Sequence, residues 1–129
     1  MDKIPPKRIL IVDDEEPVRM ICQRTLQPLG YETEAAASAD EALVLMAHKP
    51  FDLVVTDYRM PGTMDGLALA QDIKRRYPDT QIMLMTAFPA VDTAVGTLRL
   101  GALDYLVKPF EQAELVRCVA NCFIKSSAG

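Results

Sequence analysis

The sequence predicts an α/β fold with a doubly wound, five-stranded parallel sheet, and three observations lead to this prediction. Five short apolar runs alternate with five stretches of helical periodicity along the chain. The run Leu53–Val55 is apolar at each position, which is typical of a strand buried on both faces of a parallel sheet. Four of the five runs end in a polar residue. Because right-handed crossovers permit little else, the alternation implies a parallel sheet with helices on both faces.

The first half of the chain is expected to form two strand–helix units before the central strand. The first helix begins after an acidic stretch and ends at Gly30, a usual residue after a helix. Ser38 and Glu41 form a capping box for the second helix, which ends near Pro50. The expected elements are strands at Arg8–Val12 and Tyr31–Ala36 and helices at 17–29 and 39–49.

The second half continues the alternation from the central strand, which Asp57 follows directly. A Pro61-Gly62 turn then leads to Asp65, which is placed to cap the third helix. Asp92 is expected to begin the fourth helix. The remaining expected elements are helices at 65–77, 92–101 and 112–125 and strands at Gln81–Thr86 and Asp104–Val107.

Length and composition indicate one ordinary domain. The 129 residues are 50% hydrophobic and 25% charged, with a formal net charge of -4, and a chain of this length holds a core without disulfides or metals. The sequence has no basic stripe that would bind nucleic acid directly. No apolar run approaches the ~20 residues needed to cross a bilayer, and the first residues lack the apolar core of a signal peptide. We therefore expect a cytoplasmic domain that does not bind membranes.

The three cysteines do not form a site of their own. Cys22, Cys118 and Cys122 are an odd number, which argues against a disulfide framework, and the only histidine is His48. Without further ligands, the i, i+4 pair Cys118 and Cys122 is expected to pack in the core. His48 is expected to be a solvated residue at a helix end.

The polar residues at the strand ends are the candidate functional site. Asp13 and Asp14 follow the first strand, Asp57 the third, Thr86 ends the fourth, and Lys108 follows the fifth. All these ends lie on one edge of a parallel sheet, where ligands bind in open α/β folds. Carboxylates within ~5 Å of one another repel by a few kcal/mol per pair, so they share protons or hold a cation. With only oxygen ligands on offer, the fitting cation is Mg²⁺.

This arrangement suits phosphoryl transfer to a carboxylate. An aspartate can attack phosphorus and form an acyl phosphate. The charge that develops on the phosphoryl oxygens is stabilised by a metal ion, an ammonium group and a hydroxyl donor. Mg²⁺, Lys108 and Thr86 would supply these three.

Nearly the whole chain resembles the receiver domains of two-component response regulators. The matching segments are ILIVDDE, VVTDYRMPG, MTAF and DYLVKPF, in the family's order and spacing. The resemblance implies a flavodoxin-like fold with strand order 2-1-3-4-5. It also implies the following roles: phosphoacceptor, Asp57; Mg²⁺ ligands, Asp13, Asp14, Asp57 and the backbone carbonyl of Arg59; phosphate-binding lysine, Lys108; switch residues, Thr86 and Tyr105; and a cis bond before Pro109.

The resemblance further implies partners and an output. The phosphoryl donor would be a sensor histidine kinase or a phosphotransfer protein in a two-component phosphorelay. Segment Val91–Lys125 would be the switching surface and would mediate partner choice or a phosphorylation-dependent homodimer. The segment from Thr86 to Phe110 looks most like receivers of transcriptional regulators. We expect a receiver domain at 1–125 and the start of a linker, or an end of the expressed segment, at 126–129.

Two places depart from the commonest pattern of the family. The loop MPGTMDG is one residue longer than the usual MPGMDG, which affects the path after Pro61. Arg59 and Phe88, each two residues beyond a pocket residue, occupy positions that vary in the family and tune the lifetime of the phosphoryl group. Arg59 is expected either to cover the opening of the pocket or to pair with an acid such as Glu15.

Other interpretations of these residues remain open at this point. Asp13 and Asp14 could cap the first helix, Thr86 could simply end a strand, and Tyr105 could be a half-buried strand residue. A Mg²⁺-dependent phosphatase with an aspartyl nucleophile would carry a second Asp where this chain has Arg59. A nucleotide-binding domain is disfavoured because the first strand–helix turn has four acids where a phosphate cradle needs glycines.

Overall fold

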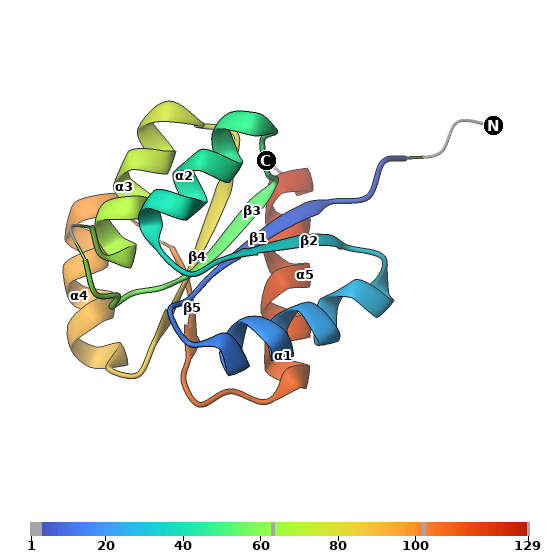
Figure 1. Cartoon of the computed structure of the whole chain (residues 1–129). Coiled ribbons are helices and arrows are strands. Elements are labelled where there is room, and N and C mark those ends of the chain that lie inside the picture. The colour runs from blue at the N-terminus through green and yellow to red at the C-terminus, as the bar shows by residue number, and fades with distance from the viewer. Residues whose placement is uncertain (1–3, 63, 102, 129) are drawn as a thin grey trace.

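The computed structural model describes residues 4–62, 64–101 and 103–128 and has the expected α/β fold (Figure 1). The strands are β1 (Arg8–Val12), β2 (Glu32–Ala36), β3 (Leu53–Asp57), β4 (Gln81–Thr86) and β5 (Asp104–Val107). The helices are α1 (Glu16–Leu26), α2 (Ala39–His48), α3 (Gly66–Arg76), α4 (Pro89–Leu100) and α5 (Gln112–Ala128). Within these residues the sheet has the order β2-β1-β3-β4-β5, and all neighbouring strands are parallel. The predicted fold and strand order are therefore confirmed.

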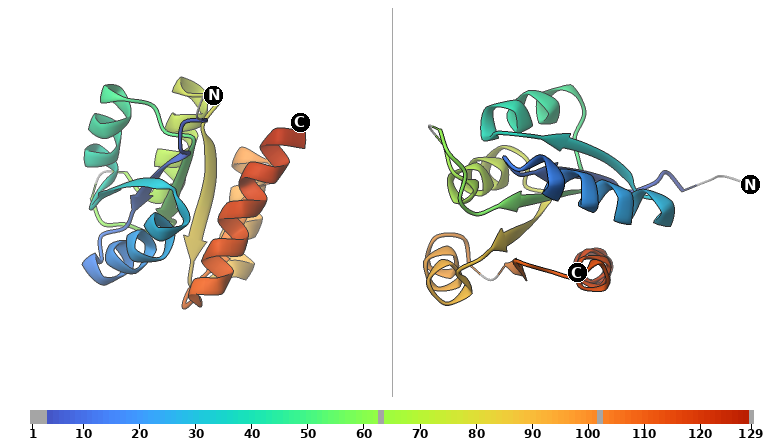
Figure 2. Two further views of the ribbon diagram at one scale, coloured as in Figure 1. Left: turned by 90° about the vertical axis from the view of Figure 1, so that its right-hand side faces the viewer. Right: turned by 60° about the horizontal axis from the view of Figure 1, so that its bottom comes forward.

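Helices cover both faces of the sheet, with a core on each face (Figure 2). Successive residues of a strand point to opposite faces. Ile9 and Ile11 accordingly pack with residues of α1 and α5, whereas Leu10 and Val12 pack with residues of α2 and α3. All residues of β1 and β3 are buried, which explains why their sequences lack the alternation of a half-exposed strand.

The first helix is shorter than its periodicity predicts. The α-helix ends at Leu26, and Gln27–Leu29 forms a 3-10 turn, η1. Pro28 has no N–H to donate, so the regular hydrogen-bond pattern stops there. Gly30 follows with a φ of 95°, the left-handed conformation that lets the chain turn into β2.

The fourth helix begins three residues earlier than predicted. It starts at Pro89, whose fixed φ suits the first turn of a helix, and Phe88 is the N-cap residue. The prediction that Asp92 begins this helix was therefore wrong. Asp92 lies within the first turn, where its side chain is free to make tertiary contacts.

The last helix continues to Ala128, three residues beyond the predicted Lys125. The division between a domain at 1–125 and a linker at 126–129 stays a prediction, and Gly129 lies outside the described residues. So does Thr63, the central residue of the unusual loop MPGTMDG. Among the residues that the structure describes, no helix is both long enough and apolar enough to cross a membrane.

Candidate functional site

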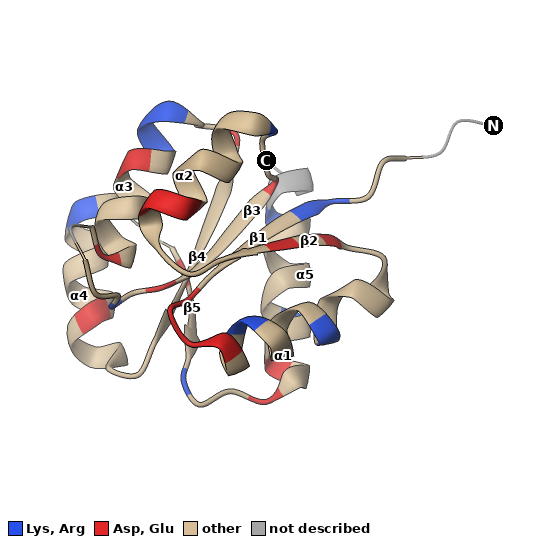
Figure 3. Cartoon of the chain, viewed as in Figure 1, with Lys and Arg blue, Asp and Glu red and all other residues tan. Residues whose placement is uncertain are grey.

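Three carboxylates gather at the carboxyl edge of the sheet, where β1 and β3 end. Val12 pairs with Thr56 in the parallel register, so the next residues on the two strands, Asp13 and Asp57, are neighbours. One carboxylate oxygen from each of Asp13, Asp14 and Asp57 lies within 4.8 Å of the others. Asp13 is fully buried, Asp57 is nearly buried and Asp14 is exposed. In Figure 3 the acids after β1 form a continuous red segment leading into α1.

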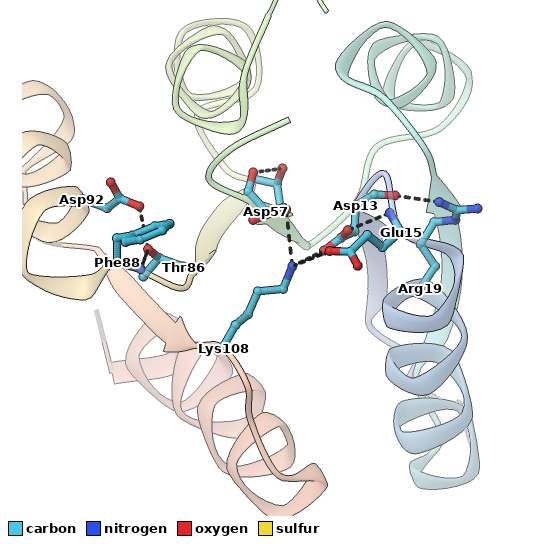
Figure 4. A network of polar contacts seen from close by, with 9 residues as sticks. Asp13, Glu15, Arg19, Asp57, Thr86, Phe88, Asp92 and Lys108 are labelled. Atoms are coloured by element: carbon cyan, nitrogen blue, oxygen red, sulfur yellow. Dashed lines mark hydrogen bonds and ion pairs between the residues drawn. The ribbon is translucent and has the colours of Figure 1, made fainter. Parts of the chain in front are cut away.

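Lys108 lies between the acids and joins two of them (Figure 4). Its Nζ is 2.8 Å from Oδ2 of Asp13 and 3.3 Å from Oδ2 of Asp57, and 3.9 Å from Oε1 of Glu15. The Lys108–Pro109 peptide bond is cis, as the resemblance implies. Burial lowers the pKa of Lys108, but hydrogen bonds and attraction to Asp13 and Asp57 outweigh it, so the net pKa is raised. Lys108 is therefore an ammonium ion at neutral pH.

The environment of Asp57 disfavours its negative charge. Burial raises the pKa of Asp57, and the nearby Asp13 carboxylate raises it further. Lys108 and a hydrogen bond from the backbone N–H of Arg59 act in the opposite direction without cancelling the rise. One lysine thus does not compensate the whole cluster. The uncompensated carboxylates offer only oxygen ligands, which fits Mg²⁺ held by Asp13, Asp14 and Asp57.

Thr86 ends β4 at the same edge, but its hydroxyl is turned to another partner. The hydroxyl donates to Oδ2 of Asp92 over 2.6 Å and accepts from the backbone N–H of Phe88 over 2.9 Å. In Figure 4 these contacts lie on the far side of Lys108 from Asp13. Within the described part of the chain, Thr86 is therefore engaged with α4 and not with Asp57.

Asp92 also pairs with Arg59, which was expected either to cover the pocket or to pair with a nearby acid. The Arg59 guanidinium lies 2.7 Å from Oδ1 of Asp92 and 5.0 Å from the centre of the Phe88 ring. Arg59 therefore pairs with Asp92 and not with the suggested Glu15. Phe88 is 57% exposed and lines the mouth of the cavity described next.

These residues surround a cavity of about 520 Å³ above the sheet edge. Its polar lining includes Asp57, Thr86 and Lys108, and its rim includes Arg59 and Phe88. The space is large enough for a phosphoryl group and its solvent. With Pro109, which also lines it, the cavity thus unites six of the predicted site residues.

Tyr105 lies apart from this cavity, on β5 against α4. The ring is half-buried, and its hydroxyl is buried without a hydrogen-bond partner among the described residues. A Cβ placed on Gly96 would lie 2.0 Å from this hydroxyl, so the tyrosine occupies a notch that only glycine leaves open. Burial, followed by the nearby Tyr58 and Asp92, raises the pKa of Tyr105.

Cys22, Cys122 and His48 lie as expected, whereas Cys118 is only half-buried against the core. All three thiols are free, Cys22 and Cys122 are buried, and His48 is exposed at the end of α2. Burial is the main cause that raises the pKa of Cys22 and Cys122 to about 12, so both thiols stay protonated at neutral pH.

Asp92 is the functional candidate that sequence reasoning missed. An aspartate three residues after a proline and shortly before an apolar periodic stretch has the pattern of a helix cap. Its 1% exposure and its two partners come from tertiary structure. A partial signal was available, because Asp92 follows Thr86 closely in a segment already suspected of function.

Comparisons with known proteins agree on one family. Residues 9–120 match the model of the response regulator receiver domain. The response regulator protein FleR of Pseudomonas aeruginosa is 46% identical over 114 residues, 88% of this chain and 24% of FleR. The transcriptional regulatory protein ZraR of Salmonella typhimurium is 46% identical over 103 residues, 80% of this chain and 23% of ZraR. This chain therefore spans about a quarter of the length of these curated relatives.

A solved structure supports the same conclusion. The receiver domain of NtrX from Brucella abortus superposes with a TM-score of 0.80 at 34% identity. The match covers 88% of this chain and 95% of that domain.

Proposed function

Because this chain belongs to the receiver domains of two-component response regulators, we propose that Asp57 accepts a phosphoryl group from the phosphohistidine of a sensor histidine kinase or a phosphotransfer protein. The observation that carries this assignment is the position of Asp57 on the cavity, 3.3 Å from the Lys108 ammonium and beside two further acids. Asp13 is fully buried and is therefore a poorer nucleophile for an external donor.

The transfer forms one bond and breaks one. A carboxylate oxygen of Asp57 attacks phosphorus, the P–N bond of phosphohistidine breaks, and its electron pair stays on the imidazole. Lys108 stabilises the charge on the phosphoryl oxygens. Later attack of water on phosphorus returns Asp57 to a carboxylate. We propose that the domain promotes both steps on its own side chain and does not turn over a separate substrate.

Receiver domains bind Mg²⁺ in an acidic pocket, and we assign its ligands here as Asp13, Asp14, Asp57 and the backbone carbonyl of Arg59. When bound, the ion neutralises carboxylates and the charge that develops during transfer. The support in this chain is the all-oxygen donor set and the raised pKa of Asp57.

We assign the switch to Thr86 and Tyr105 and the responsive surface to α4, β5 and α5, within Val91–Lys125. Both residues contact α4, so a phosphoryl group that draws Thr86 toward Asp57 changes how this helix packs. We expect the unphosphorylated domain to be mainly monomeric and the phosphoryl mimic beryllofluoride to promote a homodimer. Ultracentrifugation with and without beryllofluoride tests the dimer, and hydrogen exchange tests the surface.

We propose that the output is transcriptional and is delivered by other parts of a longer regulator. The support is the likeness to ZraR, a transcriptional regulatory protein of which this chain matches a quarter. A stand-alone phosphorelay protein is the alternative. Response regulators are usually cytoplasmic, and we place this one in the cytoplasm, without direct contact of the domain with nucleic acid or membrane.

Phosphorylation by acetyl phosphate with Mg²⁺, followed by intact mass spectrometry, tests the acceptor. Wild type should gain one phosphoryl group, whereas Asp57→Asn, or wild type with excess chelator, should gain none. Asp40→Asn, which changes an exposed acid on α2, is the control and should behave as wild type. A phosphoryl group on Asp57→Asn would refute the assignment. Turnover of added phosphoesters would instead favour a phosphatase. That class has its second acid at the position of Arg59, which in this chain pairs with Asp92.

A further inference from the structure

We propose that Asp92 is a positioning residue that holds the Thr86 hydroxyl on α4 and releases it only when a phosphoryl group on Asp57 competes for it. This inference rests on the proposed function of Asp57. The inference assigns a role to Asp92, which takes no part in the proposed phosphoryl transfer to Asp57.

The hydrogen bond that Thr86 donates to Asp92 is mutually exclusive with a hydrogen bond donated to phosphate. A threonine hydroxyl has one hydrogen to donate, and here Asp92 receives it over 2.6 Å. The N–H of Phe88 donates to the same oxygen and fixes its orientation. Thr86 therefore has to give up Asp92 before it can donate to a phosphoryl oxygen.

Asp92 is buried, so the loss of a donor is costly. Its residue exposure is 1%, and its described partners are Thr86 on Oδ2 and Arg59 on Oδ1. A buried carboxylate oxygen left without a donor keeps its desolvation penalty. The bond to Thr86 thus lowers the equilibrium constant for moving the Thr86 hydroxyl from Asp92 to a phosphoryl oxygen by roughly tenfold or more, which is the usual size of a hydrogen bond to a charged group.

Arg59 links the loop after β3 to the first turn of α4. It lies two residues after Asp57 in the chain, and its side chain contacts Asp92. The guanidinium remains on Asp92 when Thr86 leaves, so the carboxylate keeps one of its two described partners and its place on α4. Asp92 therefore determines how strongly Thr86 resists the phosphoryl group.

A double-mutant cycle on beryllofluoride affinity tests this role. The four proteins are wild type, Asp92→Asn, Thr86→Val and the double variant, titrated with beryllofluoride and Mg²⁺ by NMR. Thr86 and Arg59 donate to different oxygens of Asp92, and asparagine replaces one of these oxygens with an NH₂ group that cannot accept, so one of the two bonds is lost. Asp92→Asn should bind beryllofluoride about tenfold more tightly than wild type. In the Thr86→Val background the same substitution should change affinity by less than about twofold, because no hydroxyl is left to release.

The control is Asp72→Asn, which alters another buried aspartate that pairs with arginines, here Arg75 and Arg76 of α3. It should lower thermal stability without changing beryllofluoride affinity. A measurement on wild type covers the case that the Asp92 variants fold poorly: the carboxyl ¹³C resonance of Asp92 should shift on addition of beryllofluoride, and that of Asp72 should not.

The outcomes separate this inference from the proposed function. Unchanged or weaker binding by Asp92→Asn, an equal effect with and without the Thr86 hydroxyl, or an unmoved Asp92 resonance overturns the role of Asp92 alone. Failure of wild type to bind beryllofluoride, or undiminished binding by Asp57→Asn, overturns the proposed function and this inference with it.

Discussion

Nζ of Lys108 lies 2.8 Å from Oδ2 of Asp13, although 95 residues separate the two along the chain. The contact exists because β1 and β5 both point to the same edge of the sheet, so the residues that follow them meet. It places a positive charge where the site would also hold a divalent cation. Lysine and metal ion therefore compete for the same carboxylates while they assist the same phosphoryl group.

Replacing Lys108 with methionine should separate these effects. Without the ammonium, Asp13 and Asp57 carry more uncompensated charge, so Mg²⁺ should bind several-fold more tightly. Phosphorylation by acetyl phosphate should nevertheless slow by at least tenfold, since one counter-charge for the phosphoryl oxygens is gone. Calorimetric titration and mass spectrometry measure the two quantities. Lys125→Met, which removes an exposed partner of Asp104, is the control, and weaker Mg²⁺ binding by Lys108→Met would contradict the argument.

Asp57 should make metal-free stability depend on pH. The pKa of Asp57 is raised above its ordinary value of 3.8, so the folded state keeps the proton to higher pH than the unfolded chain does. Stability therefore falls as pH rises above 3.8 through the folded pKa, and the loss is complete above the folded pKa. Asp57→Asn should raise the melting temperature by a few degrees at pH 7 without metal, and the difference should vanish below pH 3.8.

Added Mg²⁺ should reverse that comparison. It should stabilise wild type more than Asp57→Asn, because the variant lacks one carboxylate ligand. Asp40→Asn should follow wild type under each condition. A wild type that is as stable as Asp57→Asn in chelator at pH 7 would show that the cluster is compensated by other groups.

The placing of the strand-end residues at one edge of the sheet could be predicted from the sequence, because two rules determine it. Fully apolar runs predict buried parallel strands, and parallel strands bring their ends to one edge, so the sequence alone predicts that Asp57 and Lys108 lie together. The side-chain partners of Asp92 and Arg59 could not be predicted from the sequence. Asp92 resembles a helix cap in sequence, and its pairing with Arg59 depends on where Pro89 starts α4 and on how that helix packs.

Gly96 illustrates the same limit. In sequence it is a weak residue within a helical stretch, and nothing nearby shows what it faces. In the fold it leaves room for the Tyr105 hydroxyl, a contact across two elements. Resemblance to receivers implied the tyrosine, whereas only the packing of α4 on β5 shows its notch.

Gly96→Ala should therefore destabilise the domain, against the usual preference of helices for alanine. The new Cβ would lie 2.0 Å from the Tyr105 hydroxyl but 3.3 Å from the ring carbon that carries it. The expected loss is about 1–3 kcal/mol of unfolding free energy. In a Tyr105→Phe background the hydroxyl is absent, and Gly96→Ala should become neutral or stabilising by up to ~1 kcal/mol. Urea unfolding of the four proteins checks this, and equal effects in both backgrounds would mean that Tyr105 does not occupy the notch.

The last prediction concerns the lifetime of the phosphoryl group on Asp57. Phe88 and Arg59 both line the cavity, and the guanidinium stacks 5.0 Å from the ring centre while Asp92 holds its other side. Hydrolysis needs a water molecule in line with the bond that breaks, so a rim fixed in this way should exclude water more often than an open one. Phe88→Ala removes the ring and the surface on which Arg59 rests. It should therefore speed the first-order loss of phosphate several-fold, and Arg59→Ala should do so to a similar extent.

The matched control is Val91→Ala, which shortens an apolar side chain that is 60% exposed on α4 and does not line the cavity. Decay is followed by mass spectrometry after removal of acetyl phosphate, at fixed Mg²⁺. If the rim acts as one unit, the double variant Phe88→Ala/Arg59→Ala should decay little faster than either single variant, because each change alone already opens it. Decay that is unchanged or slower in both single variants would place control of the lifetime elsewhere, and fully multiplicative effects would show that the two side chains act separately.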